Sequence, residues 1–416
     1  MEKDLNAVSD FDRAYSELKL GPLTLRNRFI KAATNEGMAK GGVVSKGLAR
    51  FHEGMAAGGA ALTTVAYCAT SKDGRTFVDQ AVLDADSLAD FRALTDGVHR
   101  HGGAASAQIT HAGSFTFLDK QTLQTNRPLS SSGGFNKVGV LSGRFFKQAM
   151  TGEQLEAMAV EFVEAAKLAR EAGFDAVELH MGHGYLLSQF VSPIYNKRHD
   201  EYGGTIERRM NFPAEVLRRV LDAVGNDLAV IAKYSMTDGP KGNSIADGIA
   251  VARRLEAEGA HMAVLSNGLN VESITAMFGS SLPKAAAKPK NPVIALGMKI
   301  QALMEPPEVK FRENYLRELA LQVRGSVAMP LAYLGGIQSR DGIEQAMGDG
   351  FDAIAMGRAL IFDPAFVNKL QQGEVTQSGC TACNRCVTMM YTPGGTQCAI
   401  TPDQPDPALN LIGAAQ

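Results

Sequence analysis

Three proton-capable side chains stand close together in the middle of the chain. The sequence ELHMGHGYL, residues 178–186, contains His180, His183 and Tyr185 directly after an apolar run that is typical of a strand. Two imidazole N–H groups can hold one substrate oxygen and stabilise negative charge that develops on it. A tyrosine hydroxyl nearby can give up a proton as a general acid. A hydrogen-bonded cluster that supports a loop, or a metal site without its carboxylate, would use the same residues, so the triplet alone leaves these interpretations open.

A second set of residues has the composition of a phosphate site. The segment LGGIQSRDG is typical of a strand that ends in Gly335 and Gly336 before a capped helix, and AMGRAL repeats the pattern with Gly357 and Arg358. Glycine lets the backbone approach an anion, and the amides of a helix N-terminus point towards it. Glycines required only by tight turns are the open alternative. The pattern favours a phosphate-bearing cofactor or substrate.

Two further polar side chains end apolar runs. Gln108 closes one run, and Lys233 lies near the end of another. An amide and a cation inside a folded core are costly unless they meet a polar ligand. The sequence therefore favours a ligand beside both residues, with pairing of Lys233 to Asp238 as the open alternative.

The elements that must position these residues alternate along the chain. Short runs that are nearly all apolar are typical of strands buried on both faces. They lie near 28–33, 60–67, 104–109, 174–180, 228–234, 261–266, 330–335 and 352–357. Helical patterns separate them. The clearest begins with a capping box at Thr151 and Gln154, and its predicted buried face comprises Leu155, Met158, Ala159, Phe162, Ala165, Ala166 and Ala169. Ser244 and Ser339 are predicted caps of later helices.

Eight such units predict an α/β fold, a (β/α)₈ barrel. A doubly wound sheet is the competitor, but no G-x-G-x-x-G follows any strand. Residues 1–27 precede the first strand, and long excursions follow strand three (111–150) and strand six (267–310). Loops after strands lie on the catalytic face of a barrel, so both excursions are expected to form walls of a pocket.

Bulk composition excludes several classes of protein. With 45% hydrophobic and 21% charged residues and a net charge of −2, the chain is typical of a globular protein with no affinity for nucleic acid or an anionic membrane. The start is too polar for a signal peptide, and the stretch 56–71 is too short to span a bilayer. Five cysteines do not form a disulfide framework in a chain of this length. These features predict a cytoplasmic protein.

The motifs together resemble the Old Yellow Enzyme family of FMN-dependent ene-reductases. The resemblance runs from about residue 18 to 370, through LKLGPLTLRNRFIKAAT, AQITHAGS, the long segment from MTGEQ to RRMNF, LGGI and AMGRALIFDP. It implies FMN held non-covalently in the barrel. The residues it assigns are Ala32, Ala33, Thr34, Ala66 and Tyr67 around the ring, Gln108 on the pyrimidine edge, Lys233 near the N1–C2 region, and Gly335, Gly336, Gly357 and Arg358 on the phosphate. The family more often has arginine at the position of Lys233, and lysine keeps the charge without the fork geometry.

The resemblance also assigns the opening triplet. His180 and His183 match the pair that binds the carbonyl oxygen of an activated alkene, and Tyr185 matches the proton donor. NAD(P)H would reduce the flavin, hydride would pass from its N5 to the β-carbon, and Tyr185 would protonate the α-carbon in a ping-pong cycle. A small-molecule substrate and a homo-oligomer are expected.

A cysteine-rich segment, predicted over 371–416, follows the barrel domain at 1–370. Cys380, Cys383, Cys386 and Cys398 have the spacing of a [4Fe–4S] site, or of a Cys₄ zinc site. The spacing resembles the cluster segment of 2,4-dienoyl-CoA reductase and trimethylamine dehydrogenase. A functional cluster, a structural zinc and an inherited segment without metal remain open. Cys68 is interpreted as a core residue.

Three functions are compatible with these features. The leading one is an NAD(P)H-dependent ene-reductase acting on α,β-unsaturated carbonyl compounds. The second is a dehydrogenase of an amine or a saturated carbonyl compound that passes electrons from FMN through a cluster to a separate partner. The third is a flavin-binding electron carrier, which would need no proton donor beside the flavin.

Overall fold

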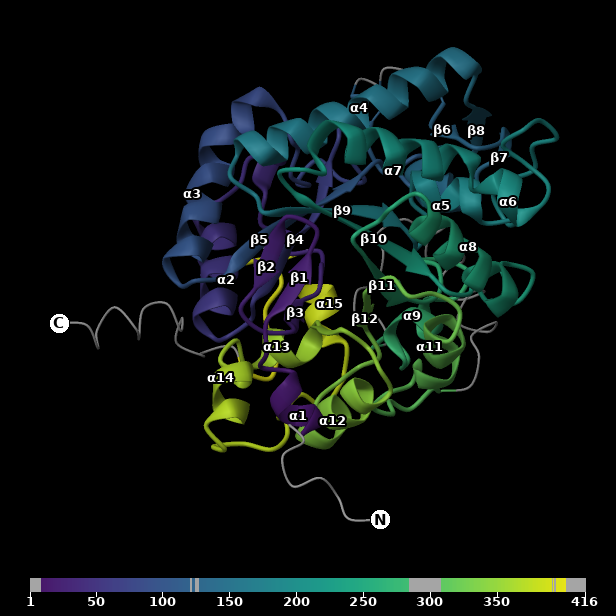
Figure 1. Ribbon diagram of the computed structural model, residues 1–416. Helices are drawn as coiled ribbons and strands as arrows, with labels where there is room; N and C mark the ends of the chain where they lie inside the picture. The colour runs from purple at the N-terminus through teal and green to yellow at the C-terminus, as the bar shows by residue number, and fades with distance from the viewer. Residues whose placement is uncertain are drawn as a thin grey trace.

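A closed barrel of eight parallel strands forms the centre of the molecule (Figure 1). The computed structural model describes residues 9–119, 122–123, 127–283, 308–390, 392 and 394–401. All eight predicted strands are confirmed: β3 (Phe29–Lys31), β4 (Leu62–Ala69), β5 (Ala104–Thr110), β9 (Ala176–Met181), β10 (Ala229–Ser235), β11 (Met262–Ser266), β12 (Leu331–Tyr333) and β13 (Ala353–Met356). They follow one another around the barrel in chain order, and β13 pairs with β3 to close it.

Helices surround the barrel because each strand is buried on both faces. The principal helix after each strand is, in order, α2 (Lys46–Ala57), α3 (Leu88–Arg100), α4 (Gly152–Glu171), α7 (Asn211–Val224), α8 (Ile245–Ala257), α11 (Arg317–Arg324), α12 (Arg340–Gly348) and α14 (Phe366–Gln371). Shorter helices are α1 (Asp10–Arg13), α5 (Leu186–Val191), α6 (Ile206–Arg209), α9 (Ile274–Phe278), α13 (Arg358–Phe362) and α15 (Arg385–Met389). Short 3₁₀ turns lie at Lys40–Gly42, Ala85–Ser87 and Val138–Ser142. Among the described residues, no helix combines the length and the apolar character needed to cross a bilayer.

Helix α4 has the cap and the buried face that its sequence predicts. The Thr151 side chain accepts from the Gln154 backbone N–H, and the Gln154 side chain accepts from the Thr151 N–H. All seven residues of the predicted apolar face are buried. Ser244 and Ser339 likewise cap α8 and α12. Satisfied donors at the helix start and a continuous apolar face fix where each helix lies against the barrel.

A hairpin closes the amino-terminal end of the barrel, in a region for which the sequence predicted no element. Strands β1 (Leu18–Leu20) and β2 (Leu23–Leu25) pair antiparallel. Leu18, Leu20 and Leu25 pack into one cluster with residues at the starts of the barrel strands, such as Ala176 and Met262. The hairpin therefore fills the amino-terminal end of the barrel with apolar side chains.

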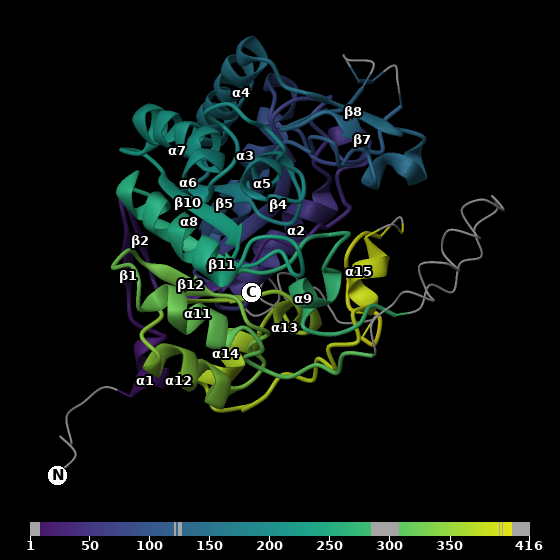
Figure 2. The same cartoon turned by 90° about the vertical axis from the view of Figure 1, so that its right-hand side faces the viewer.

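The two predicted excursions differ in structure. The first contains a small sheet of β6 (Leu129–Ser130), β8 (Phe146–Ala149) and β7 (Gly134–Phe135), in that order. The second contains α9, and its residues 284–307, including the Met-rich stretch at 294–304, lie outside the described residues. The C-terminal segment with α15 lies beside α9 (Figure 2), and Asn384 Nδ2 donates to the Ser280 hydroxyl at 2.9 Å. Two segments that are 104 residues apart in the chain thus meet at this contact.

The core face of α4 predicts a stability difference. Phe162 is fully buried between α4 and the barrel, whereas Val160 on the same helix is 46% exposed. We expect Phe162→Ala to lower the free energy of unfolding by about 3–5 kcal/mol because it leaves a cavity, measured by urea denaturation. Val160→Ala is the control and should change it by less than about 0.5 kcal/mol. Equal effects would contradict the packing described here.

Candidate active site

The carboxyl ends of the strands surround a cavity of about 430 Å³. The lining residues come from all sides of the barrel, from the excursions after β5 and β11, and from the C-terminal segment. Every residue that the sequence assigned to the cofactor or to catalysis lines this cavity, apart from Gly335: Ala32, Ala33, Thr34, Ala66, Tyr67, Gln108, His180, His183, Tyr185, Lys233, Gly336, Gly357 and Arg358. The predicted residues therefore share one cavity despite their separation in the chain.

Gly335 has a different structural reason to be glycine. A Cβ atom at this position would lie 2.0 Å from the hydroxyl oxygen of Tyr333, so the close approach of that ring excludes a side chain. Gly336 follows with φ +77°, a left-handed conformation that favours glycine. The turn after β12 thus uses one glycine for packing and one for its backbone conformation.

The opening triplet is held at the end of β9. His180 belongs to the strand, His183 has a left-handed backbone with φ +63°, and Tyr185 is the N-cap residue of α5. The ring of His180 lies 5.0 Å from that of His183 and 4.7 Å from that of Tyr185, between centroids. The tight turn at residues 182–184 therefore brings all three rings to one side of the cavity.

Both histidines are neutral, and one has an unused ring nitrogen. Burial lowers the pKa of His180 and of His183 well below the ordinary value, with Lys233 adding to the effect. His183 Nε2 lies 2.7 Å from the Ser266 hydroxyl. His180 Nδ1 is buried and has no hydrogen-bond partner among the described residues. A neutral imidazole keeps one N–H donor, so this histidine can hold an oxygen of a bound molecule.

Lys233 faces the cavity from β10, and its carboxylate neighbours differ from Asp238, the open alternative that the sequence offered. Its ammonium group lies 3.4 Å from the Ala33 carbonyl oxygen, and its pKa is lowered by burial and raised by the carboxylates of Glu178 and Glu36. The alternative partner Asp238 instead accepts from the Asn243 backbone N–H. Because residues 233 and 238 are separated by the end of the strand, their proximity in sequence does not bring them together.

Glu178 was missed by the sequence analysis. It lies opposite Gln108 in the β5–β9 pairing, and the Gln108 amide donates to its carboxylate at 2.6 Å. Its position two residues before His180 puts both side chains on the same face of β9. The alternation of polar, apolar and polar residues at 178–180 is the sequence signal that could have identified Glu178 as a site residue.

A buried ion pair supports the wall formed by the end of β3. Lys31 Nζ lies 3.6 Å from Glu36 Oε1 and donates to the hydroxyl of Thr34, which lines the cavity. Glu36 Oε2 accepts from the backbone N–H of Ala66, another lining residue, at 3.2 Å. The pair therefore fixes two stretches of backbone on one side of the site.

Two further side chains of the second excursion and its strand contribute to the cavity. Ser266, at the end of β11, contacts His183, and Asn270 N–H donates to the His183 carbonyl oxygen at 3.2 Å. The Asn270 side-chain nitrogen is buried without a hydrogen-bond partner in the part of the chain that the structure describes. This amide nitrogen can therefore donate to an acceptor on a ligand. No motif or spacing in the sequence predicts that role for Asn270.

Arg358 bridges the barrel and the C-terminal segment. Its guanidinium donates to Asn384 Oδ1 at 2.6 Å and to the Phe278 carbonyl oxygen at 2.9 Å. A Cβ atom at Gly357 would meet only a Thr34 methyl group at 3.5 Å, so the backbone here is open to the cavity. A cation beside an uncovered backbone turn suits an anion such as a phosphate.

The four C-terminal thiols are near one another and near Arg358. Burial, together with smaller contributions from the neighbouring Cys380, Cys383 and Cys398, raises the pKa of Cys386 to about 11, although Arg358 opposes the shift. Cys386 lines the cavity described above. Among the described residues, no three His, Cys, Asp or Glu side chains converge as a set of metal ligands. The cluster stays a prediction, and no step of a reaction is derived through it. Cys68 is fully buried in the core between barrel and helices.

A (β/α)₈ barrel with titratable side chains gathered at the carboxyl ends of its strands has the architecture of the barrel enzymes. The family model described as "NADH:flavin oxidoreductase / NADH oxidase family" matches residues 15–377. The chain belongs to this family. It is an FMN-dependent oxidoreductase with NAD(P)H as reductant, and its resemblance to Old Yellow Enzyme is confirmed.

Three known proteins illustrate the relationship. The chain is 42% identical over 394 residues to "4,4'-dithiodibutanoate disulfide reductase" of Rhodococcus erythropolis, covering 93% of this chain and 94% of that protein. It is 30% identical over 384 residues to "NADH oxidase" of Thermoanaerobacter brockii, covering 91% of this chain and 54% of that protein. The solved structure of an Old Yellow Enzyme homologue from Zymomonas mobilis has a TM-score of 0.70 at 20% identity, covering 94% and 99% of the two chains. The chain thus spans about half the length of the second relative and nearly all of the first.

The residues present fit FMN. The cavity offers a buried cation at Lys233, an amide at Gln108, and an open backbone turn with an arginine at Gly357 and Arg358. The Lys233 ammonium group makes a long hydrogen bond, 3.4 Å to a carbonyl oxygen, which leaves N–H groups that a polar ligand can accept from.

A pH dependence follows from the burial of Glu36. Burial raises the pKa of this carboxyl from 4.5 to about 7, although Lys31 opposes the shift. The folded protein therefore binds this proton more tightly than the unfolded chain, and the associated stability is present at low pH and lost as pH rises through 7. We expect the free energy of unfolding of the native protein, relative to Glu36→Gln, to fall between about pH 5 and pH 7 in urea denaturation. The same difference at both pH values would contradict the burial of an ionisable carboxyl at this position.

Proposed function

We propose that the protein is an NAD(P)H-dependent ene-reductase that reduces α,β-unsaturated carbonyl compounds. The observation that carries the proposal is the unused nitrogen of His180, buried in the same cavity as His183, Tyr185 and Lys233. A carrier of electrons without a substrate would have no use for a buried ring nitrogen without a partner beside a tyrosine.

The two histidines bind and polarise the carbonyl oxygen. Both are neutral because burial lowers their pKa, so each donates through one N–H group rather than as a cation. Ser266 fixes the orientation of the His183 ring through its contact with Nε2. Donors held in place before the reaction stabilise the negative charge that grows on the oxygen as the alkene is reduced.

Tyr185 is the proton donor. Its ring packs at 5.2 Å from that of Tyr67 and at 5.5 Å from that of Phe115, between centroids. These contacts hold the phenol at the edge of the cavity and exclude water from the α-carbon of the substrate. The phenol then supplies a proton to that carbon, which completes the reduction.

The cofactor accounts for the remaining chemistry. Bound FMN supplies the hydride that the β-carbon of the substrate receives. Lys233 contributes positive charge from inside the barrel, where the low dielectric makes it effective towards an anionic ring. Arg358 and the Gly357 turn hold the phosphate.

Replacement of Tyr185 tests this assignment. We expect Tyr185→Phe to lower the rate of alkene reduction by about 10²–10⁴-fold, the range for loss of a positioned general acid, while NAD(P)H still reduces the flavin at the native rate. The measurement is stopped-flow absorbance of the two half-reactions. Tyr202→Phe, on the same connection but outside the cavity, is the control and should leave both rates within about twofold. An unchanged alkene rate in Tyr185→Phe would remove the proton-donor role.

Disulfide reduction is a second candidate, because the relative at 42% identity is named for that activity. The cleavage of an S–S bond needs two electrons and ends with a thiolate and a thiol, and no carbon is protonated. Tyr185→Phe should therefore retain most of its disulfide reductase activity if disulfides are the substrate, which separates the two candidates with one variant.

The absorption spectrum distinguishes a flavin-only enzyme from one with a cluster. We expect anaerobically purified protein to show a two-banded flavin spectrum that bleaches with NADPH or NADH. A broad additional absorbance with stoichiometric iron would instead support the dehydrogenase that passes electrons to a separate partner. The control is Cys383→Ser, which should remove the additional absorbance and the iron while leaving the flavin bands in place.

A further inference from the structure

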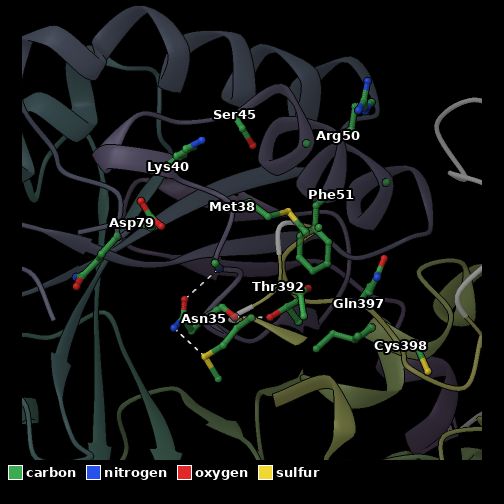
Figure 3. A pocket seen from close by; sticks show the side chains of 18 of the residues that line it. Asn35, Met38, Lys40, Ser45, Arg50, Phe51, Asp79, Thr392, Gln397 and Cys398 are labelled. Atoms are coloured by element: carbon green, nitrogen blue, oxygen red, sulfur yellow. Dashed lines mark hydrogen bonds between the residues drawn. The ribbon is translucent and has the colours of Figure 1, made fainter. Parts of the chain in front are cut away.

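Two asparagine side chains at the mouth of the barrel differ in whether they are used. Asn35 lines the active-site cavity and also a neighbouring cavity of about 1030 Å³ between α2 and the C-terminal segment. Its amide donates to the Tyr67 hydroxyl at 3.1 Å and to the Met390 sulfur at 2.9 Å, and Figure 3 marks the second contact with a dashed line. Its oxygen accepts from the Gly37 N–H at 3.1 Å. Asn270 also lines the active-site cavity, but its side-chain nitrogen is buried and has no hydrogen-bond partner among the residues that the structure describes.

The loop that carries Asn270 is otherwise held in place by its own polar side chains. Four of the five polar side chains at 266–273 have a partner: Ser266 with His183, Asn267 with Thr237, Glu272 with Tyr195, and Ser273 with the backbone of Asp238. The backbone is fixed as well, because the Gly268 N–H donates to the Thr237 carbonyl oxygen at 2.9 Å. Asn270 is therefore an unused side-chain donor on a loop whose position is already determined.

Asn270 lies beside the histidine pair. Its N–H donates to the His183 carbonyl oxygen at 3.2 Å, and Leu269 forms a parallel bridge with His183. The loop thus runs along the turn that carries this histidine. A carbonyl oxygen has two lone pairs, and His180 and His183 fill both of them in the proposed function. The Asn270 amide therefore needs another acceptor atom, and its place beside His183 puts that acceptor on the group that activates the alkene.

We propose that Asn270 is a specificity-determining residue that binds a second oxygen of the activating group of the substrate. It favours alkenes whose activating group carries two acceptor oxygens on one atom, such as a nitro group, over aldehydes and ketones with a single oxygen. This inference rests on the proposed function for the reaction and for the roles of His180 and His183. It adds a basis for selection among activated alkenes.

The physical basis of the selection is the cost of an unpaired donor. A molecule with one oxygen leaves the buried Asn270 nitrogen without an acceptor, whereas a molecule with two oxygens satisfies it. A site built to form a hydrogen bond discriminates against an analogue that lacks the group. Because the loop is fixed before a ligand arrives, little of this gain is lost to ordering. The preference is therefore expected in binding itself, before any bond of the substrate is reduced.

The test uses a matched pair of ligands with the intact FMN-loaded protein. The nitroalkene is [(E)-2-nitroprop-1-enyl]benzene, and the enal is (E)-2-methyl-3-phenylprop-2-enal, which has a formyl group in place of the nitro group. Without NAD(P)H the oxidised protein binds both without turnover, and the change in flavin absorbance gives each Kd. The preference is the Kd of the enal divided by the Kd of the nitroalkene. The values of kcat/KM for reduction of the two alkenes are then measured with NAD(P)H.

Replacement of Asn270 should remove the preference. We expect Asn270→Leu to lower it by about threefold to tenfold, as for the loss of one hydrogen bond, while the Kd of the enal changes by less than about twofold. Asn270→Asp keeps the shape without the N–H groups and should also lose the preference. Asn267→Ala is the matched control on the same loop. Asn267 lies outside the cavity lining and accepts from the Thr237 N–H at 2.9 Å, so its loss should weaken both ligands in the same proportion.

The outcomes separate the role of Asn270 from the proposed function. Reduction of both alkenes with the same preference in Asn270→Leu as in the native protein, or with equal losses for both ligands, would overturn the role of Asn270 and leave the ene-reductase standing. A preference retained in Asn270→Asp would overturn it as well, because no N–H group remains. A preference in binding that depends on Asn270, with neither alkene reduced after NAD(P)H is added, would support this role and overturn the ene-reductase.

Discussion

Burial of charge at the carboxyl end of the barrel is the constraint on which the site depends. Lys31, Glu36, Glu178 and Lys233 are almost wholly removed from water, where an isolated charge would be costly. Glu36 lies 3.6 Å from Lys31, and the carboxylates of Glu178 and Glu36 both favour the charged form of Lys233. Removal of one partner from such a set leaves an uncompensated charge. Because Glu36 also binds the backbone of Ala66, the electrostatics of the site and the position of its wall are coupled.

The sequence was sufficient for the barrel because its signals are local. A strand buried on both faces is mostly apolar, and β10 follows that pattern up to Lys233, whereas β9 departs from it at Glu178. The capping residue Thr151 predicts where helix α4 begins, and apolar residues that recur every three or four positions predict its buried face. The β1–β2 hairpin was not predicted, because its strands alternate leucine with polar residues over only three positions, whereas β3 and β12 lie in longer apolar runs. Its role at the base of the barrel depends on contacts with residues far away in the chain.

The site was predictable to the extent that strand ends specify it. His180, Gln108 and Lys233 could be placed at the mouth because parallel strands end on the same side. Glu36 and Asn270 could not, since the role of each depends on a partner from a different strand or loop. The resemblance to a family supplied the chemical roles, and the structure supplied the neutrality of the histidines and the contacts of Arg358.

The C-terminal segment is part of the rim of the barrel rather than an appendage. Thr396 binds the backbone of Asn35 and Glu36, and Gly37 has no room for a side chain because the Met390 carbonyl oxygen lies 2.0 Å from its would-be Cβ. This arrangement has a consequence for the order of events in the cell. The residues that complete the cofactor cavity leave the ribosome after the last barrel strand, so a nascent chain can close its barrel before it possesses a finished site. The docking of Met390 and Thr396 onto the first loop of the barrel is thus one of the steps that complete the cavity.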